Sequence, residues 1–87
     1  MRIVHTTPRF ERKLRGFLKK HAALGDAVRH MMRIVTDGPT DALRIHKLKG
    51  VLRECHAARI SYEYRVVFIL TDEAVTFIDI GTHDDVY

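Results

Sequence analysis

The spacing of apolar side chains predicts one strand and then a helix at the start of the chain. Residues 1–6 have the pattern of a short strand. Thr7 followed by Pro8 favours a helix start, since a threonine hydroxyl accepts hydrogen bonds from free amides and proline suits the first helical position. Apolar residues recur at helical spacing up to about Lys20, and the other face of this helix is basic: Phe10, Leu14, Phe17 and Leu18 against Arg9, Arg12, Lys13, Arg15, Lys19 and Lys20.

A second helix is predicted after Gly25, which interrupts the first pattern. Asp26 is expected to cap this helix, and its apolar stripe consists of Val28, Met31, Met32 and Val35. The segment Asp37-Gly38-Pro39 ends it. Two consecutive helices of this length predict an antiparallel helical hairpin that packs on a sheet.

The second half of the chain has the pattern of strands. A first strand is expected over residues 53–61, and the nearly continuous apolar run over 64–71 is typical of a central strand covered on both faces. A last strand is predicted over 75–80, with Gly81 marking its end. The fold class is therefore α+β, in the order β-α-α-β-β-β. A helical hairpin covers one side of a small, mainly antiparallel sheet, and residues 1–87 form a single domain.

Composition favours a soluble cytoplasmic protein with a polyanionic partner. The longest apolar run, residues 66–70, is far shorter than the roughly 20 residues of a membrane span, no signal peptide is apparent, and the single cysteine, Cys55, agrees with a reducing compartment. The net charge of +4 favours nucleic acid or an acidic protein as the partner. In the second half of the chain, lysine and arginine are confined to positions 44–65. Positions 66–87 contain acidic residues but no lysine or arginine.

Three segments carry residues suited to chemistry. The run His46-Lys47-Leu48-Lys49-Gly50 reads either as a phosphate-contacting patch with an adjacent imidazole or as a polar loop anchored by its leucine. Arg65 opens an apolar strand, where an unpaired arginine is costly to bury. We therefore expect it at the sheet rim, paired with a carboxylate such as Asp79 across the hairpin, or exposed on a concave face that Arg59 also reaches.

The third segment is the C-terminal run over residues 81–87. There, His83 suits general acid or base work because imidazole titrates near neutrality, although a lone histidine is more often a surface residue than a catalyst. Tyr87 either stacks on a base or covers the edge of the core. The sequence contains no zinc-binding motif and no glycine-rich phosphate loop, and adjacent Asp84 and Asp85 point in opposite directions on an extended chain. We therefore expect no metal and no cofactor.

The runs HKLKG, RISYEYRVVF and IGTHDDVY, in this order and spacing, resemble the RelE/ParE superfamily of type II toxin–antitoxin toxins. The similarity is greatest to RelE-like and YafQ-like mRNA interferases, and the predicted element order agrees with their fold. The resemblance implies a ribosome-associated endoribonuclease that cuts mRNA by attack of a ribose 2′-OH on the adjacent phosphate. Arginine and lysine, rather than a metal ion, would stabilise the charge.

The resemblance also implies roles for individual residues. His83 would be the general acid for the leaving oxygen, His46 the base or its helper, and Arg65 the group that stabilises phosphate charge. Tyr87 would orient or stack on the substrate. Four further residues would hold the RNA backbone or, in the case of the acid, tune a neighbouring histidine: Lys47, Lys49, Arg59 and Glu63.

Two departures from the family pattern affect the general base. Arg59 stands where YafQ-like toxins carry a second histidine, and a tryptophan common near Cys55 is missing, so that His56 is a possible local substitute. Two other functions remain open: a ParE-like inhibitor that binds DNA gyrase without catalysis, and an inactive relative that binds an antitoxin alone. In each case a cognate antitoxin is the expected protein partner, in a complex that can form a higher oligomer. The nuclease would in addition bind mRNA and the ribosome, and no membrane partner is expected.

Overall fold

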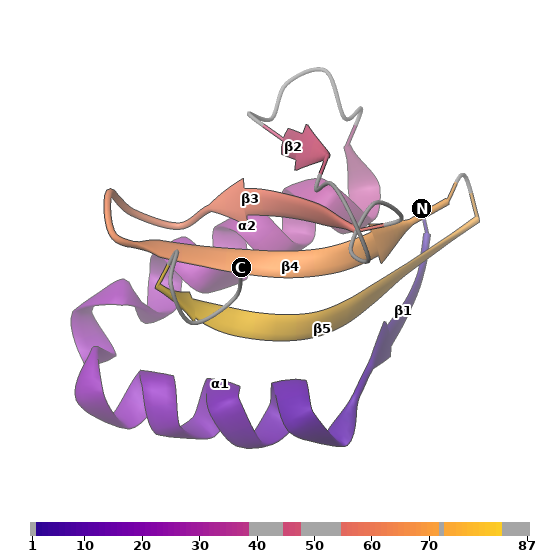
Figure 1. Cartoon of the computed structure of the whole chain (residues 1–87). Coiled ribbons are helices and arrows are strands. Elements are labelled where there is room, and N and C mark those ends of the chain that lie inside the picture. Colours follow the sequence, from indigo (N-terminus) through magenta and orange to yellow (C-terminus); the bar gives the residue numbers. More distant parts are fainter. Residues whose placement is uncertain (1, 39–44, 48–54, 72, 83–87) are drawn as a thin grey trace.

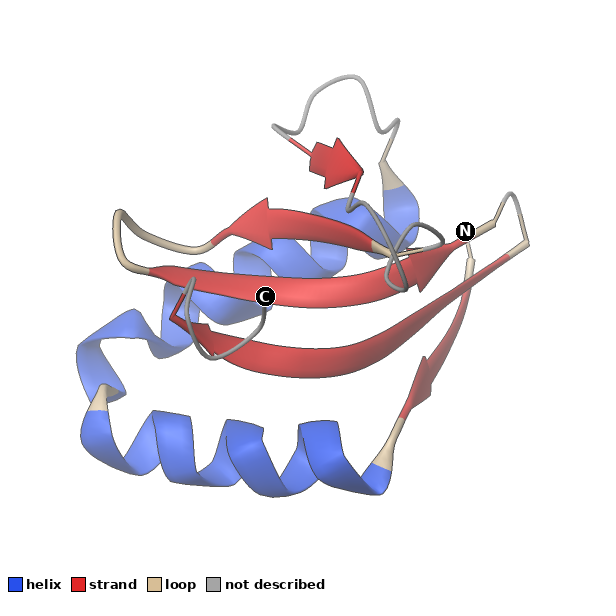
Figure 2. Ribbon diagram, in the orientation of Figure 1, coloured by secondary structure: helices blue, strands red, loops and turns tan. Residues whose placement is uncertain are grey.

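The computed structural model describes residues 2–38, 45–47, 55–71 and 73–82, which form two helices and a five-stranded sheet. The helices are α1 (Pro8–Lys20) and α2 (Gly25–Asp37), joined by a short 3₁₀ helix, η1 (Ala22–Leu24). Figure 1 shows α1 running along the β5 side of the sheet and α2 crossing behind it, and Figure 2 distinguishes the two kinds of element. The predicted α+β class and helix–sheet architecture are confirmed. No helix in the described ranges is long and apolar enough to cross a membrane.

The strands are β1 (Ile3–Thr6), β2 (Ile45–Lys47), β3 (His56–Arg59), β4 (Tyr64–Leu70) and β5 (Ala74–Thr82). They lie in the order β1-β5-β4-β3-β2, with β1 parallel to β5 and the other neighbours antiparallel. The predicted order of elements is confirmed, with β2 as an additional three-residue strand. The expectation that Gly81 ends the last strand is wrong, because pairing with β4 continues β5 to Thr82.

Helix α1 begins and ends where its sequence predicts. The Thr7 hydroxyl accepts a hydrogen bond from the Phe10 amide at 3.1 Å, and Pro8 occupies the first turn. At the other end, the His21 amide donates to the Phe17 carbonyl at 2.8 Å. Phe10 and Phe17 are buried, so the apolar side of the helix rests on the sheet.

Helix α2 differs from its prediction at the first turn. Leu24, not Asp26, is the residue that precedes the helix, and the Leu24 side chain forms no capping hydrogen bond. Asp26 lies one residue inside the helix, where the positive end of the helix dipole stabilises its carboxylate. The same carboxylate pairs with Arg29 at 2.5 Å. The 3₁₀ turn of η1 leads directly into α2, which explains why no side-chain cap is needed.

The main core lies between the helices and the sheet. It joins buried residues of α1 and α2 to those of β3, β4 and β5, with the Phe77 ring 5.5 Å from that of Phe10 and 6.0 Å from that of Phe68. A second small cluster, formed by Cys55, Ala57 and Val67, lies on the opposite face. Strand β4 therefore buries residues on both faces, as its continuous apolar run predicts.

Candidate functional site

Two arginines lie side by side on the sheet face that points away from the helices. Ala58 of β3 and Val66 of β4 are paired and both belong to the main core. The next pair in the register, Arg59 and Arg65, must therefore project from the opposite face, because side chains alternate along a strand. Arg59 is exposed and Arg65 is partly buried. The structure thus brings together the two arginines that the sequence predicts for one face.

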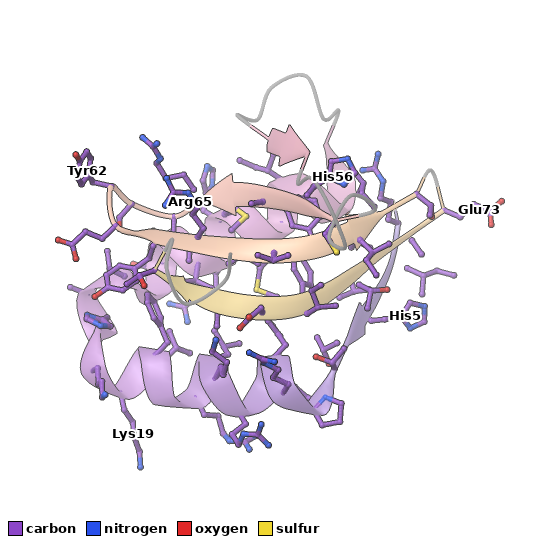
Figure 3. All side chains as sticks on the ribbon, viewed as in Figure 1. His5, Lys19, His56, Tyr62, Arg65 and Glu73 are labelled. Atoms are coloured by element: carbon purple, nitrogen blue, oxygen red, sulfur yellow. The ribbon has the colours of Figure 1, made fainter. Side chains whose placement is uncertain are left out.

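The arginine pair lies near the tip of the β3–β4 hairpin. The connection is short, with the Ile60 amide donating to the Tyr64 carbonyl at 2.9 Å, and this contact fixes the register of the two strands. Figure 3 shows Arg65 close to the end that carries Tyr62, which projects from the hairpin tip. On the other side of β4, the residue in register with Arg65 is Gly81 of β5, which has no side chain.

Arg65 does not pair with Asp79, which is one of the partners that the sequence offers for its charge. A bulge in β5 places Asp79 opposite Val67, and its carboxylate instead contacts Lys13 and Arg9 of α1, the latter at 3.5 Å. Lys13 Nζ donates to Asp79 Oδ1, and the Asp79 side chain is 13% exposed. The acid in the middle of β5 therefore serves to hold α1 on the sheet.

The other predicted site residues are placed only in part. Glu63 is exposed in the β3–β4 connection, immediately before β4. The backbones of His46 and Lys47 form part of β2, opposite Ala57 and His56 of β3. The remaining three lie outside the described residues: Lys49, His83 and Tyr87.

His56 is not available as a substitute for the missing family histidine. It is paired with Phe68, which belongs to the main core, and the two rings stack with centroids 6.1 Å apart. Its side chain therefore lies on the helix side of the sheet, away from Arg59 and Arg65. Its Nδ1 atom is buried without a hydrogen-bond partner. Within the described residues, no group of three His, Cys, Asp or Glu side chains is arranged to hold a metal ion.

The structure adds residues that the sequence did not single out. His21, at the end of α1, packs against the rings of Phe17 and Tyr64 at centroid distances of 4.9 and 4.7 Å. Lys13 of the same helix reaches Asp79. A signal was present: Lys13, Phe17 and Lys20 recur at helical spacing between the apolar and basic faces, with His21 beside them, and Tyr64 directly precedes Arg65. Only the fold brings these positions together.

The arrangement is suited to binding phosphate. Two guanidinium groups at adjacent positions on one face are mutually unfavourable unless negative charge lies close, and none of the described acids forms an ion pair with Arg59. Guanidinium offers a planar set of donors that matches phosphate oxygens. A polynucleotide backbone is therefore a fitting ligand for this face.

Comparison with solved structures identifies the fold. The chain is similar to YafQ from Escherichia coli, with a TM-score of 0.86 at 16% identity over 100% of this chain and 99% of the other. It is also similar to a chain of the E. coli DinJ–YafQ toxin–antitoxin complex, with a TM-score of 0.82 at 17% identity over 99% and 97% of the two chains. A YoeB/ParE toxin from Agrobacterium tumefaciens matches with a TM-score of 0.79 at 18% identity over 93% and 98%.

No protein-family model and no curated protein sequence matches the chain. The likeness to solved structures nevertheless extends over nearly the full length of both chains in each case. The chain therefore has the fold of RelE/ParE-type toxins and is YafQ-like in structure, which confirms at the level of fold the resemblance found in its sequence motifs.

Proposed function

We propose that this protein is the toxin of a type II toxin–antitoxin system and that it cuts mRNA on the ribosome without a metal ion. The observation that carries the proposal is the Arg59–Arg65 pair on the face opposite the helices. The fold supports it, because the chain resembles toxins that include one solved with its antitoxin. The sequence supports it too, since His83 follows the end of β5 directly.

The reaction is an internal transfer of the phosphoryl group. A base removes the proton of the 2′-OH, the 2′-oxygen bonds to phosphorus, and the bond from phosphorus to the 5′-oxygen breaks. His83 donates the proton that the leaving oxygen takes up, and His46 is the base or its helper. The products are a 2′,3′-cyclic phosphate and a 5′-hydroxyl. Arg65 stabilises the charge that develops on the phosphorane oxygens, the role that a metal ion would otherwise fill.

The remaining residues bind and orient the RNA. Arg59, beside Arg65, holds a phosphate of the strand, and Lys47 and Lys49 extend the cationic surface. Tyr87 stacks on a base near the cut, since aromatic rings contribute to single-strand binding irrespective of sequence. Glu63, immediately before β4, tunes a neighbouring histidine.

An antitoxin is the protein partner in this proposal. The solved complex of YafQ with DinJ supports a partner of this kind. The net charge of +4 favours an acidic segment that neutralises the cationic surface. Such a segment competes with RNA for the same charges, so bound antitoxin is expected to prevent cleavage.

Induction of the chain in growing bacteria, followed by mapping of mRNA 5′ ends, tests the proposal. New ends within translated messages, absent from an Arg65→Ala strain that accumulates the protein to the same level, are the expected result. Intact messages together with induction of the DNA-damage response would favour the ParE-like inhibitor of gyrase instead. Intact messages without growth arrest would indicate an inactive relative.

A further inference from the structure

A pocket of about 370 Å³ lies between α1 and the end of the sheet where β4 begins and β5 ends. Its walls come from the last two turns of α1, from the start of β4 and from the end of β5. The residues that matter for its chemistry are Gly16, Phe17, Lys20, His21, Tyr64 and Thr82. It is on the helix side of β4, whereas Arg59 and Arg65 project from the other face of the sheet at the same end.

Aromatic rings form one wall of this pocket. Phe17 and Tyr64 meet edge to face at a centroid distance of 5.0 Å, and the His21 ring lies 4.7 Å from Tyr64. Tyr64 and His21 are only partly buried, so part of this ring surface faces the pocket. A cluster of this kind offers a flat apolar ligand a surface on which to stack.

Gly16 leaves the pocket open on the helix side. A Cβ atom at this position would meet no other atom within 4 Å, so close packing does not require glycine here. Glycine in the middle of a helix is less favourable than alanine, because it has more conformational freedom to lose. The helix therefore retains a residue that weakens it, at the point where any larger side chain would extend toward the pocket.

Among the described residues at the rim, Lys20 is the cation that is suited to bind an anion. Lys13 also lines the pocket, but its ammonium group is held by Asp79. Lys20 is exposed, and none of the described acids forms an ion pair with it. Within the described lining, the pocket thus combines an aromatic surface with the ammonium group of Lys20.

We propose that this pocket binds one nucleotide of an RNA strand, with the base against the partly exposed rings of His21 and Tyr64 and a phosphate at Lys20. The inference rests on the proposed function, since it gives the same RNA a second contact beyond the arginine pair. An RNA strand that passes around the end of the sheet where β4 begins would meet Arg59 and Arg65 on one face and this pocket on the other. The aromatic wall favours a base, and the Lys20 ammonium group matches a phosphate.

Binding of adenosine 5′-monophosphate to the purified full-length chain, followed by NMR, tests the pocket without ribosomes or cleavage. We expect saturable shifts at the amides of Gly81 and Thr82 and at the His21 ring. Adenosine and ribose 5-phosphate, each carrying half of the ligand, should bind about tenfold more weakly, the size expected for loss of one stacking or charged contact. No shift at these positions with the monophosphate would overturn the proposal.

Matched variants separate the pocket from general basicity. Lys20→Gln should lower the affinity for the monophosphate to that of adenosine, whereas Lys19→Gln should leave it unchanged, since Lys19 projects from α1 away from the sheet (Figure 3). Gly16→Leu should abolish binding, and Arg15→Leu, which adds the same side chain next to it, should not. If Lys20→Gln binds the monophosphate as tightly as Lys19→Gln, or Gly16→Leu as tightly as Arg15→Leu, the pocket is not the binding site.

Two further outcomes decide between partners and between proposals. Shifts at the same resonances with a peptide of one phenylalanine between glutamates, and none with the monophosphate, would assign the pocket to a protein partner and overturn the nucleotide. Arg65→Ala should retain binding of the monophosphate. If the chain binds the monophosphate but cuts no RNA, the proposed nuclease fails and the nucleotide pocket remains.

Discussion

Arg59 on β3 lies directly opposite Arg65 on β4, on the sheet face away from both helices. Their neighbours in the register, Ala58 and Val66, are buried in the main core, so a one-residue slip of the β3–β4 hairpin against β5 would turn both arginines toward that core. The position of the pair is therefore fixed by the same apolar contacts that stabilise the fold.

The two arginines are expected to fail in different ways when replaced. Arg65→Ala should lower the rate of cleavage about 100-fold at saturating substrate, as the loss of one group that stabilises transition-state charge does. Arg59→Ala should mainly raise KM and lower the salt dependence of RNA affinity by about 0.7 in log–log slope, the effect of one lost phosphate contact on a single strand. Arg33→Ala, which removes an exposed arginine of α2, is the control in steady-state assays for the loss of one positive charge. A change in KM alone for both arginine variants would contradict a catalytic role for Arg65.

The two helical-hairpin glycines Gly16 and Gly38 should respond oppositely to alanine. Gly16→Ala should stabilise the fold by about 0.5–1 kcal/mol, because the new methyl group meets nothing and the helix gains propensity. At Gly38 a Cβ atom would lie 2.9 Å from the Ile34 carbonyl oxygen, so Gly38→Ala should destabilise it. Urea unfolding of both variants measures the difference, and a stabilised Gly38→Ala would contradict the close approach of the Ile34 carbonyl to this position.

Arg2 should contribute to stability out of proportion to its place near the start of the chain. Its guanidinium donates to the carbonyls of Val35 at 3.0 Å, Gly38 at 3.1 Å and Thr71 at 2.9 Å, which ties the end of α2 to the β4–β5 turn. Arg2→Ala should lower the free energy of unfolding by about 1–3 kcal/mol, because charged donors to carbonyls are lost.

The control for Arg2 is another arginine that forms an exposed ion pair. Arg29 pairs with Asp26, but both side chains are largely exposed, at 70% and 95%. Arg29→Ala should therefore change the free energy of unfolding by less than about 0.5 kcal/mol. Equal losses of unfolding free energy for Arg2→Ala and Arg29→Ala, in thermal or urea unfolding, would contradict a specific stabilising role for the Arg2 hydrogen bonds.

His56 should be dispensable for cleavage. Its Nδ1 is buried without a partner and its ring stacks on Phe68, so His56→Phe removes an unsatisfied polar atom and keeps the aromatic contact. We expect unchanged cleavage and an unfolding free energy equal to or about 1 kcal/mol above that of the parent. A large loss of cleavage in a folded His56→Phe variant would place this histidine in the reaction after all.

The sequence predicts the ends of an element where those ends depend on residues adjacent in the chain. Thr7 and Pro8 fixed the start of α1, because capping involves only the first helical turn. Strand β2 was missed because its three residues, including polar His46 and Lys47, become a strand only through backbone pairing with distant β3. Gly81 was assigned to a strand end, but pairing with Arg65 across the sheet keeps it within β5.

The site was predictable on the hairpin and not beyond it. Alternation along two adjacent strands suffices to place Arg59 and Arg65 on one face. The partner of Asp79 was not predictable, because it depends on a bulge in β5 and on the position of Lys13 in a helix 66 residues away. The pocket at Tyr64 likewise depends on how α1 rests on the sheet.

The measurement that tests the central claim most directly uses a translated message with a single 2′-deoxynucleotide on the 5′ side of the cut. With purified chain and ribosomes, the all-ribose message should be cleaved to a 2′,3′-cyclic phosphate and a 5′-hydroxyl. The deoxy message should stay intact at that position, because no 2′-oxygen is present to attack phosphorus. Cleavage of the deoxy message at the same rate, or no cleavage of either message, would contradict the account.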